Sequence, residues 1–219
     1  MRYHIITTQP KNFNSFLTTG LIARGIDKKI INIDIHSLYD DGLGTHKSID
    51  DTPYGGGAGM IIRVDVMDRA LAALKTKKTR IILLTPQGKR FNQKDARRLS
   101  KQKELILVSG RFEGYDERIR SLVDEEISTG DYVLTSGDLP AMVLVDAISR
   151  QIPGFIEEKS SLLTESFDEN LLEYPQYTRP EIYLKKKVPE VLLSGNHAEI
   201  EKWRKKMALE KTKKRHQSF

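Results

Sequence analysis

Hydrophobic residues along the chain fall into short runs, some continuous and some mixed with polar residues, and into longer stretches with helical spacing. The short runs, which predict strands, occupy residues 2–7, 30–35, 79–85 and 104–109. Helices are predicted by three-and-four spacing, or by a basic stretch after the candidate N-cap Asn92, over residues 12–24, 64–75 and 92–103. Short hydrophobic strands that alternate with helices predict an α/β fold with a parallel sheet.

The stretch from residue 125 to residue 150 has an unusual pattern. A strand-like segment ends at Gly130, and a second apolar piece leads into Ser136-Gly137-Asp138. The helix expected over residues 141–149 is hydrophobic on nearly every side, so we expect it to be buried in the core or against another chain. Pro140 falls in the first turn of this helix, where a missing backbone N–H costs least.

Three of the predicted strands lead into turns that contain glycine. The turns cover residues 86–88, 110–114 and 130–137. Because ligands of open parallel sheets bind at the carboxyl ends of strands, we expect these turns to line one pocket. Tight turns inside a sheet core would produce the same pattern, and the spacing alone does not separate the two interpretations.

A further glycine-rich segment, residues 55–59, has four glycines in five positions. Backbone N–H groups in such a segment can cradle a phosphate. It is not a P-loop, because no Gly-Lys-Ser/Thr follows, and it is not a dinucleotide fingerprint, because Met60 holds the third glycine position. A flexible loop explains the pattern equally well.

Composition narrows the class of protein. With 219 residues, 38% hydrophobic and 30% charged, the chain suits one large globular domain or one domain with a small appendage. It contains no cysteine, and its five histidines show no spacing typical of metal ligands. We see no signal peptide and no hydrophobic run of membrane length, so we expect a cytoplasmic protein that does not associate with membranes.

Positive charge is concentrated towards the C-terminus. The net charge of the chain is +6, and residues 179–219 contain twelve Lys/Arg against five Asp/Glu. A helix with Ile200, Trp203 and Met207 as its hydrophobic stripe is expected after the N-cap Asn196. A basic helical module predicts a polyanionic partner, most simply nucleic acid. A solvated tail is the alternative for the last ten residues.

Six segments, in order and spread over most of the chain, carry a specific resemblance. They are Asp51-Thr52-Pro53-Tyr54-Gly55-Gly56-Gly57 with Gly59-Met60, Thr85-Pro86-Gln87-Gly88, Gly110-Arg111-Phe112-Glu113-Gly114 with Asp116-Glu117-Arg118, Gly130 to Met142, Tyr177-Thr178-Arg179-Pro180, and Leu193-Ser194-Gly195-Asn196-His197. With these segments the chain resembles the bacterial tRNA (guanine-N1)-methyltransferase family, of the SPOUT class of methyltransferases. No single segment would identify the family, but six segments in the same order are highly specific.

The resemblance implies an architecture that periodicity cannot show. The expected fold is a knotted α/β parallel-sheet SPOUT domain, with a deep trefoil knot, and a small α-helical C-terminal domain. We expect an S-adenosylmethionine-binding domain over residues 1–155, an interdomain linker over 156–170 and a basic tRNA-binding domain over 171–219. A homodimer whose active sites combine both chains is also implied, and the hydrophobic helix at 141–149 would suit its interface.

The implied reaction moves a methyl group from S-adenosylmethionine to N1 of the guanosine directly 3′ of the anticodon in certain tRNAs. The residues expected to hold S-adenosylmethionine are Leu84, Thr85, Pro86, Gly110, Arg111, Phe112, Glu113, Ser128, Thr129, Gly130, Asp131, Tyr132, Val133, Leu134, Gly137 and Pro140. The residues expected to contact tRNA are Asp51, Tyr54, Gly55, Gly56, Gly57, Gly59, Ser166, Glu173, Tyr177, Arg179, Asn196 and His197. No metal-ligand set is expected, although magnesium is a candidate cofactor with acids such as Glu113 nearby.

Two residues are expected to carry the chemistry. Guanine N1 is a poor nucleophile until it loses its proton, which a positioned carboxylate can accept. The family places an aspartate directly before Ser-Phe, and this chain has Glu165 there, one methylene longer, so Glu165 is the expected base and Asp168 the alternative. By its position in the motif, Arg150 is the expected cation that stabilises negative charge on the base.

Other departures from the family pattern allow a second interpretation. Ser136 stands where glycine is usual, Phe112 where tyrosine is common and Asn170 where glycine is usual, and the family's C-terminal module usually continues further. The alternative function is therefore a tRNA-binding protein of the same fold with weakened or lost catalysis. Retention of Arg150 and Gly110 favours the enzyme, because a binding module has no need of a pocket for the methyl donor.

Overall fold

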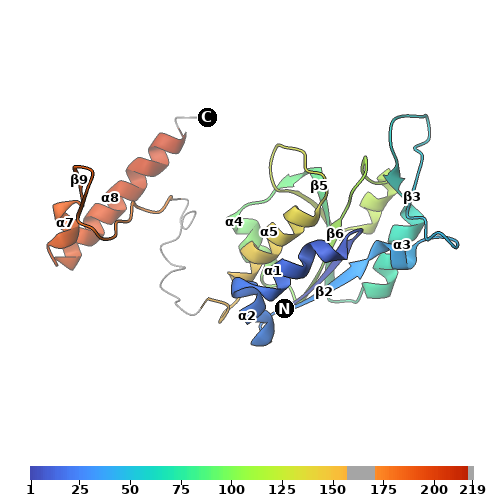
Figure 1. The fold of residues 1–219 in the computed structure, drawn as a ribbon, viewed down its shortest axis with the longest axis horizontal. Coiled ribbons are helices and arrows are strands. Elements are labelled where there is room, and N and C mark those ends of the chain that lie inside the picture. Colours follow the sequence, from blue (N-terminus) through green and yellow to red (C-terminus); the bar gives the residue numbers. More distant parts are fainter. Residues whose placement is uncertain (157–170, 217–219) are drawn as a thin grey trace. The chain divides into compact units, whose positions relative to one another are not determined.

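The computed structural model of the protein describes residues 1–156 and 171–216. The chain divides into two compact units, residues 1–156 and 157–219. Each unit is described by itself below, with the elements labelled as in Figure 1.

A five-stranded parallel sheet forms the centre of the first unit (Figure 1). Its strands are β1 (Arg2–Thr7), β2 (Asn32–Ser37), β5 (Thr79–Arg90), β6 (Glu104–Ser109) and β7 (Glu125–Ser128). They lie in the order β2-β1-β6-β5-β7, and every neighbouring pair is parallel. The α/β fold with a parallel sheet, predicted from the alternation of strands and helices, is confirmed.

Alternating side chains of the strands build one hydrophobic core on each face of the sheet. On one face Tyr3 and Ile5 pack under the 3-10 helix η1 (Pro10–Phe13) and helices α1 (Asn14–Thr18), α2 (Gly20–Asp27), α4 (Gln93–Leu99) and α5 (Asp138–Ser149). On the other face Ile6 and Val108 pack under helix α3 (Val64–Leu74) and the 3-10 helices η2 (Leu38–Asp41) and η3 (Glu117–Leu122). The sheet is therefore covered on both sides, as parallel sheets usually are.

The predicted helices are present, but α4 ends at Leu99 and not at residue 103, and one expected helix is divided in two. Helix α3 buries Val66, Met67, Ala70 and Leu71, as its spacing predicts, and the Asn92 side chain accepts from the backbone amides of Lys94 and Asp95 at 2.9 and 3.2 Å as the N-cap of α4. The single helix expected over 12–24 is wrong, because Thr19 is extended (φ −130°, ψ 156°) and separates α1 from α2. Hydrophobic spacing continues across this break, so periodicity alone could not locate it.

Strand β5 continues past the turn at which it was expected to end. Leu84 and Lys89 both lie opposite Ile127 of β7, so residues 85–88 leave the ladder and the strand then rejoins it. Gly88 makes this possible, since a Cβ there would lie 2.5 Å from the backbone nitrogen of Ile127. The apolar piece at 132–135, by contrast, is not a strand and runs as a loop into α5.

In the second unit, residues 171–216 contain a β-ribbon and two helices. They are β8 (Ile182–Tyr183), β9 (Lys186–Lys187), α7 (Glu190–Leu193) and α8 (His197–His216). The Asn196 side chain accepts from the backbone amide of Glu199 at 3.3 Å, which confirms the predicted N-cap of α8. Ile200 and Ala208 are buried, and the rings of Tyr177 and Trp203 lie 6.4 Å apart. Within the described part of the chain, no helix is long and apolar enough to cross a membrane.

Candidate functional site

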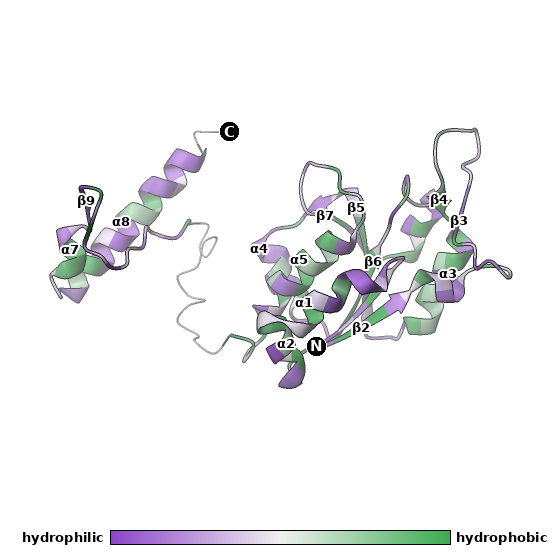
Figure 2. Ribbon diagram, viewed as in Figure 1, coloured by the Kyte–Doolittle hydropathy of each residue, from purple (hydrophilic) through white to green (hydrophobic). Residues whose placement is uncertain are grey.

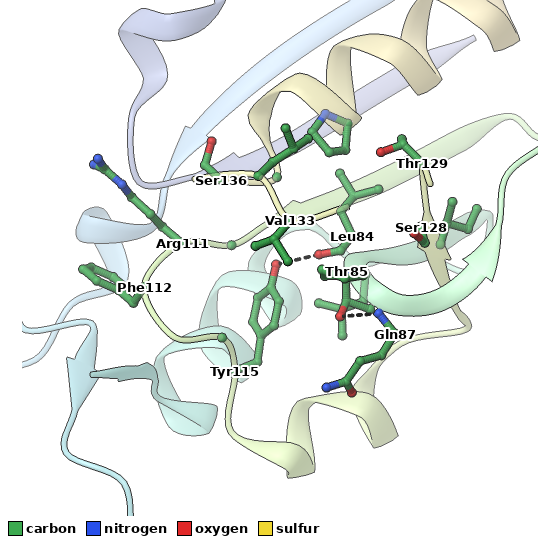
Figure 3. Close-up of a pocket in the computed structure, with 18 of the residues that line it drawn as sticks. Leu84, Thr85, Gln87, Arg111, Phe112, Tyr115, Ser128, Thr129, Val133 and Ser136 are labelled. Carbon is green, nitrogen blue, oxygen red and sulfur yellow. Dashed lines mark hydrogen bonds between the residues drawn. The ribbon is translucent and has the colours of Figure 1, made fainter. Parts of the chain in front are cut away.

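A cavity of about 340 Å³ opens at the carboxyl ends of β5, β6 and β7 (Figure 3). Its walls are the excursion of β5 at residues 85–87, the turn at 110–115 after β6, the segment 127–137 that includes the end of β7, and Pro140 of α5. The three glycine-containing turns therefore line one pocket, as expected. The volume falls in the range of pockets that bind small molecules.

Most of the residues expected to hold S-adenosylmethionine lie on the wall of this cavity. Those that line it are Leu84, Thr85, Pro86, Gly110, Arg111, Phe112, Glu113, Ser128, Thr129, Tyr132, Val133, Leu134, Gly137 and Pro140. Gly130 and Asp131 do not line it. The lining also contains residues that the sequence analysis did not assign to the methyl donor: Leu83, Gln87, Gly114, Tyr115, Glu117, Arg120, Ile127, Thr135 and Ser136.

Tyr115 connects two of the pocket walls. Its hydroxyl donates towards the carbonyl oxygens of Leu84, at 3.2 Å, and Val108, at 3.3 Å, and so ties β5 to β6 (Figure 3). Burial raises the pKa of the Tyr115 hydroxyl, which keeps it a neutral donor. A Cβ on Gly110 would lie 2.2 Å from the Tyr115 oxygen, so the close approach of these two residues requires glycine.

The loop before α5 is anchored to the end of β6 and to a buried carboxylate. The Gly137 amide donates to the Gly110 carbonyl oxygen at 2.8 Å. Asp138, 3% exposed, accepts from the hydroxyls of Thr7 and Ser109 at 2.7 and 2.6 Å and from the Asn12 amide at 2.8 Å. These bonds fix the start of α5, and with it one side of the cavity, to the ends of β1 and β6.

Charged side chains gather at another part of the lining. Arg120 donates to Glu117 at 2.9 Å and also contacts Glu126 and the Gln87 side-chain oxygen. Through Gln87 it holds the excursion of β5 against η3. The lining thus contains acids and arginines as well as hydrophobic side chains, although sequence spacing gave no signal for this group.

The glycine-rich segment at 55–59 packs against a pocket residue. It connects the short strands β3 (Asp50–Asp51) and β4 (Ile61–Ile62), and the Glu113 amide donates to the Met60 carbonyl oxygen at 3.0 Å. Gly59 has φ +77°, and a Cβ there would lie 2.5 Å from Cγ of Glu113, so this contact needs glycine. Tyr54 is fully exposed beside it.

The remaining predicted site residues fall in three places. Arg150 follows the last residue of α5, and its amide donates to the Asp146 carbonyl oxygen at 3.1 Å. Glu165, Ser166 and Asp168 lie outside the described residues. In the second unit, Tyr177, Arg179, Asn196 and His197 are exposed and Glu173 is half-buried. Across residues 1–156 and 171–216, no group of three or more His, Asp or Glu side chains could hold a metal ion.

Comparisons with known proteins agree with the resemblance in the sequence. A family model described as tRNA (Guanine-1)-methyltransferase TrmD matches residues 1–219. A protein of Mycoplasmopsis synoviae is 48% identical over 215 residues, covering 98% of this chain and 94% of its own. Proteins of Dictyoglomus turgidum and Prochlorococcus marinus are 46% and 45% identical over 212 residues, covering 97% and 96% of this chain and 86% of their own. All three are named tRNA (guanine-N(1)-)-methyltransferase.

The parallel α/β sheet, the pocket built from turns at the carboxyl ends of its strands and the family match together define a SPOUT methyltransferase. The match over the whole length then makes the class specific. The chain belongs to the tRNA (guanine-1)-methyltransferase family. This result favours the enzyme over the alternative of a binding protein without catalysis.

Proposed function

We propose that the protein transfers a methyl group from S-adenosylmethionine to N1 of the guanosine directly 3′ of the anticodon of tRNA. The observation that supports this most strongly is the convergence of three glycine-containing turns on one cavity, in a chain that its family matches from end to end. Since tRNA is a cytoplasmic molecule in bacteria, we place the activity in the cytoplasm.

The chemistry of the lining fits S-adenosylmethionine. Leu84, Ile127 and Leu134 offer hydrophobic surface to a flat purine, and the hydroxyls of Thr85, Ser128 and Thr129 offer hydrogen bonds to polar atoms. The acids Glu113 and Glu117 and the arginines Arg111 and Arg120 suit a molecule that carries an ammonium, a sulfonium and a carboxylate. When bound, this cofactor supplies an electrophilic methyl group on its sulfonium.

We propose Glu165 as the general base, with Asp168 as the alternative, and Arg150 as the cation. A carboxylate accepts the N1 proton, so that the nitrogen lone pair becomes available for the methyl group. A guanidinium then stabilises the negative charge left on the guanine, chiefly at O6, by charge-assisted hydrogen bonds. These roles follow from position in the family motif. Magnesium stays a candidate cofactor, and no residues are assigned to it.

The two units divide the work in this proposal. Residues 1–155 hold the methyl donor, residues 156–170 link the units, and residues 171–219 grip tRNA. Contacts with tRNA are assigned to Asp51, Tyr54, Gly55, Gly56, Gly57, Gly59, Ser166, Glu173, Tyr177, Arg179, Asn196 and His197. Support comes from the exposure of Tyr54, Tyr177 and His197, and from the excess of Lys and Arg after residue 178.

A homodimer is proposed from the outer surface of α5 and the loop before it. The helix buries Ala141, Leu144, Val145 and Ile148, yet Leu139 and Val143 are 58% and 50% exposed, and Val133 of the loop is 85% exposed. Exposed hydrophobic side chains grouped in this way are typical of an interface between chains. A second copy of this chain would bury them.

The trefoil knot is likewise a proposal. It is supported by membership of the family and by the loop before α5, where the Gly137 amide bonds the Gly110 carbonyl oxygen in the turn after β6. Such close backbone packing leaves these turns little freedom to move apart.

The function is tested by methyl transfer from labelled S-adenosylmethionine to two tRNA transcripts that differ only in having guanosine or adenosine 3′ of the anticodon. Label in the guanosine transcript alone is expected. Label in neither, from a protein that binds the donor, would contradict the proposal. The base is tested by Glu165→Gln beside Asp168→Asn: turnover should fall about a hundredfold or more in the first variant only, and unchanged turnover in Glu165→Gln would reject that residue.

A further inference from the structure

The ribbon formed by β8 and β9 in the second unit has no role in the site described so far. Ile182 lies opposite Lys187 and Tyr183 opposite Lys186 in antiparallel register. The Val188 amide closes the base of the ribbon by donating to the Glu181 carbonyl oxygen at 2.9 Å. Every residue from Glu181 to Lys187 is exposed, on both strands and at the turn.

The first strand and the turn carry three large hydrophobic side chains in succession. Ile182 is 52% exposed, Tyr183 66% and Leu184 77%. Single exposed hydrophobic residues are normal on a protein surface, but a contiguous group marks a surface that contacts a partner. Figure 2 shows hydrophobic and hydrophilic residues together in this ribbon.

The second half of the ribbon adds three consecutive cations, Lys185 to Lys187. The register places Tyr183 directly opposite Lys186, so an aromatic and a cationic side chain project from the same face of the ribbon. Single-stranded nucleic acid is bound by this combination, because bases stack on aromatic rings while lysines neutralise the backbone phosphates. A protein partner would have to desolvate the same three lysines, and lysine is depleted from the centres of protein interfaces.

The two-residue turn between β8 and β9 has a backbone conformation that glycine adopts more easily than other residues, yet neither of its residues is glycine. Leu184 and Lys185 both have positive φ, +46° and +64°. Two-residue hairpin turns with positive φ at both positions usually contain Asn-Gly or similar pairs, because other residues adopt this region at a cost. The strained turn therefore presents a leucine and a lysine at the tip of the ribbon, which is consistent with a binding role for these side chains.

We infer that the ribbon from Ile182 to Lys187 is a contact surface for a single-stranded part of tRNA. A base stacks on Tyr183, and Lys186 on the same face contacts a neighbouring phosphate, while Lys185 at the turn and Lys187 on the opposite face add positive charge. This inference rests on the proposed function for the identity of the RNA, and it extends the tRNA surface to residues that the family motifs did not assign.

The test measures the dissociation constant of the full-length protein for an unmodified tRNA transcript with guanosine 3′ of the anticodon, at several salt concentrations. Tyr183→Ala should raise this constant about tenfold, whereas Tyr183→Phe, which keeps the ring, should stay within about twofold. Lys186→Ala should weaken binding and reduce the slope of log Kd against log salt by about 0.7.

Matched controls lie in the first unit. Tyr39→Ala removes a tyrosine that is 40% exposed, and Lys77→Ala removes an exposed lysine from the turn between α3 and β5. Both control variants should have the same dissociation constant for tRNA as the wild-type protein. All variants should bind S-adenosylmethionine as the wild type does, because the ribbon and the cavity belong to different units.

The inference would be overturned if Tyr183→Ala and Lys186→Ala bound tRNA with the same affinity and the same salt dependence as the wild-type protein. The same result with a change in molecular mass in solution would assign the ribbon to contact between protein chains instead, which also overturns it. A wild-type protein that fails to methylate the guanosine transcript, while the Tyr183 and Lys186 variants still lose affinity for it, would reject the proposed reaction and leave the RNA surface standing.

Discussion

The backbone amide of Gly137 donates a 2.8 Å hydrogen bond to the carbonyl oxygen of Gly110. The two residues are neighbours in space because the loop before α5 folds over the end of β6. A Cβ on Gly137 would lie 2.9 Å from Cα of Ser109 and 3.1 Å from the nitrogen of Gly110, both backbone atoms with little freedom to move. One wall of the cavity is thus held by main-chain contacts.

Gly137→Ala should therefore displace the loop from the cavity. We expect the dissociation constant for S-adenosylmethionine to rise about ten- to a hundredfold, because a shift near 1 Å has effects of this size in a positioned site. Isothermal titration calorimetry measures it. Asp68→Ala, at an exposed position of α3 that does not line the cavity, is the control and should bind normally. Equal affinities for wild type and Gly137→Ala would show that the loop does not shape the pocket.

Gly110→Ala should also weaken cofactor binding, but through a clash with a side chain, which a second substitution can relieve. Here the added Cβ would meet the end of the Tyr115 side chain at 2.2 Å, not backbone. The double variant Gly110→Ala/Tyr115→Val should regain part of the lost affinity, since the smaller side chain removes the clash. Tyr115→Val alone is the control for the loss of the hydroxyl contacts. A double variant no better than Gly110→Ala would contradict the steric explanation.

Asp138→Asn should destabilise the fold by about 1–3 kcal/mol. The Asp138 carboxylate accepts hydrogen bonds from Thr7, Ser109 and Asn12. The side-chain NH2 group of asparagine is itself a donor, so in this buried place it would face one of these donors without an acceptor. Urea unfolding followed by circular dichroism measures the change. Asp146→Asn, at an exposed position of the same helix, should change stability by less than about 0.5 kcal/mol. Similar stabilities for the two variants would argue against the bonds described here.

An ion-pair network between β5, α4 and β7 should make stability depend on pH on the acid side. Lys89 and Arg98 contact Asp95 at 2.8 and 3.3 Å, and Arg98 contacts Glu125 at 2.7 Å. Burial by itself would raise the pKa of Asp95, but the hydrogen bond and charge of Lys89, with those of Arg98, outweigh it and hold the pKa below its usual range. Arg98 and Arg80 lower the pKa of the half-buried Glu125 in the same way against its burial.

A carboxylate with a depressed pKa in the folded state contributes stability above its unfolded pKa, about 4, and loses it as pH falls through the folded value. Asp95→Asn should therefore be less stable than wild type at pH 7, and the difference should shrink progressively below pH about 4. Thermal unfolding between pH 2.5 and 7 shows this. Asp68→Asn, at an exposed position of α3, is the control. A difference that stays constant over this range would contradict the linkage.

Val143→Glu should separate the proposed dimer without unfolding the chain. The side chain is 50% exposed, so a charge there costs little in a single protomer but would be desolvated at an interface. Sedimentation equilibrium should give a mass near 25.0 kDa for the variant and twice that for wild type. Leu21→Glu, at a 38% exposed position of α2, should stay dimeric. A wild-type protein that sediments as a monomer would reject the homodimer.

The sequence predicted the fold best where one physical signal dominates. Helix α3 has a complete hydrophobic stripe, and β6 and the first half of β5 contain continuous hydrophobic runs, so where these segments begin was predicted within a few residues. The break at Thr19 and the return of β5 after Gly88 depend on contacts with neighbouring strands and helices, which local spacing does not contain. The ribbon at 182–187 was missed because its turn has neither glycine nor asparagine.

The candidate site, too, was predicted where local sequence carries the signal and missed where contacts between distant residues decide. Glycines at strand ends indicated the pocket, and the family motif supplied most of its lining. Tyr115 and Arg120 were missed because each acts through partners distant along the chain, Leu84 for the first and Gln87 for the second. Only the folded arrangement brings such partners together. The roles of Glu165 and Arg150 stay predictions.

The excursion of β5 has a consequence for how fast ligands exchange. The residues that flank 85–88, Leu84 and Lys89, both pair with Ile127 of β7. Strand β7 is the edge strand of the sheet. This wall of the cavity cannot swing outward as a hinged lid does. Exchange of a bound molecule past this wall should therefore be no faster than local opening of β7. Hydrogen exchange at the amides of Ile127 and Ser128 would measure that opening.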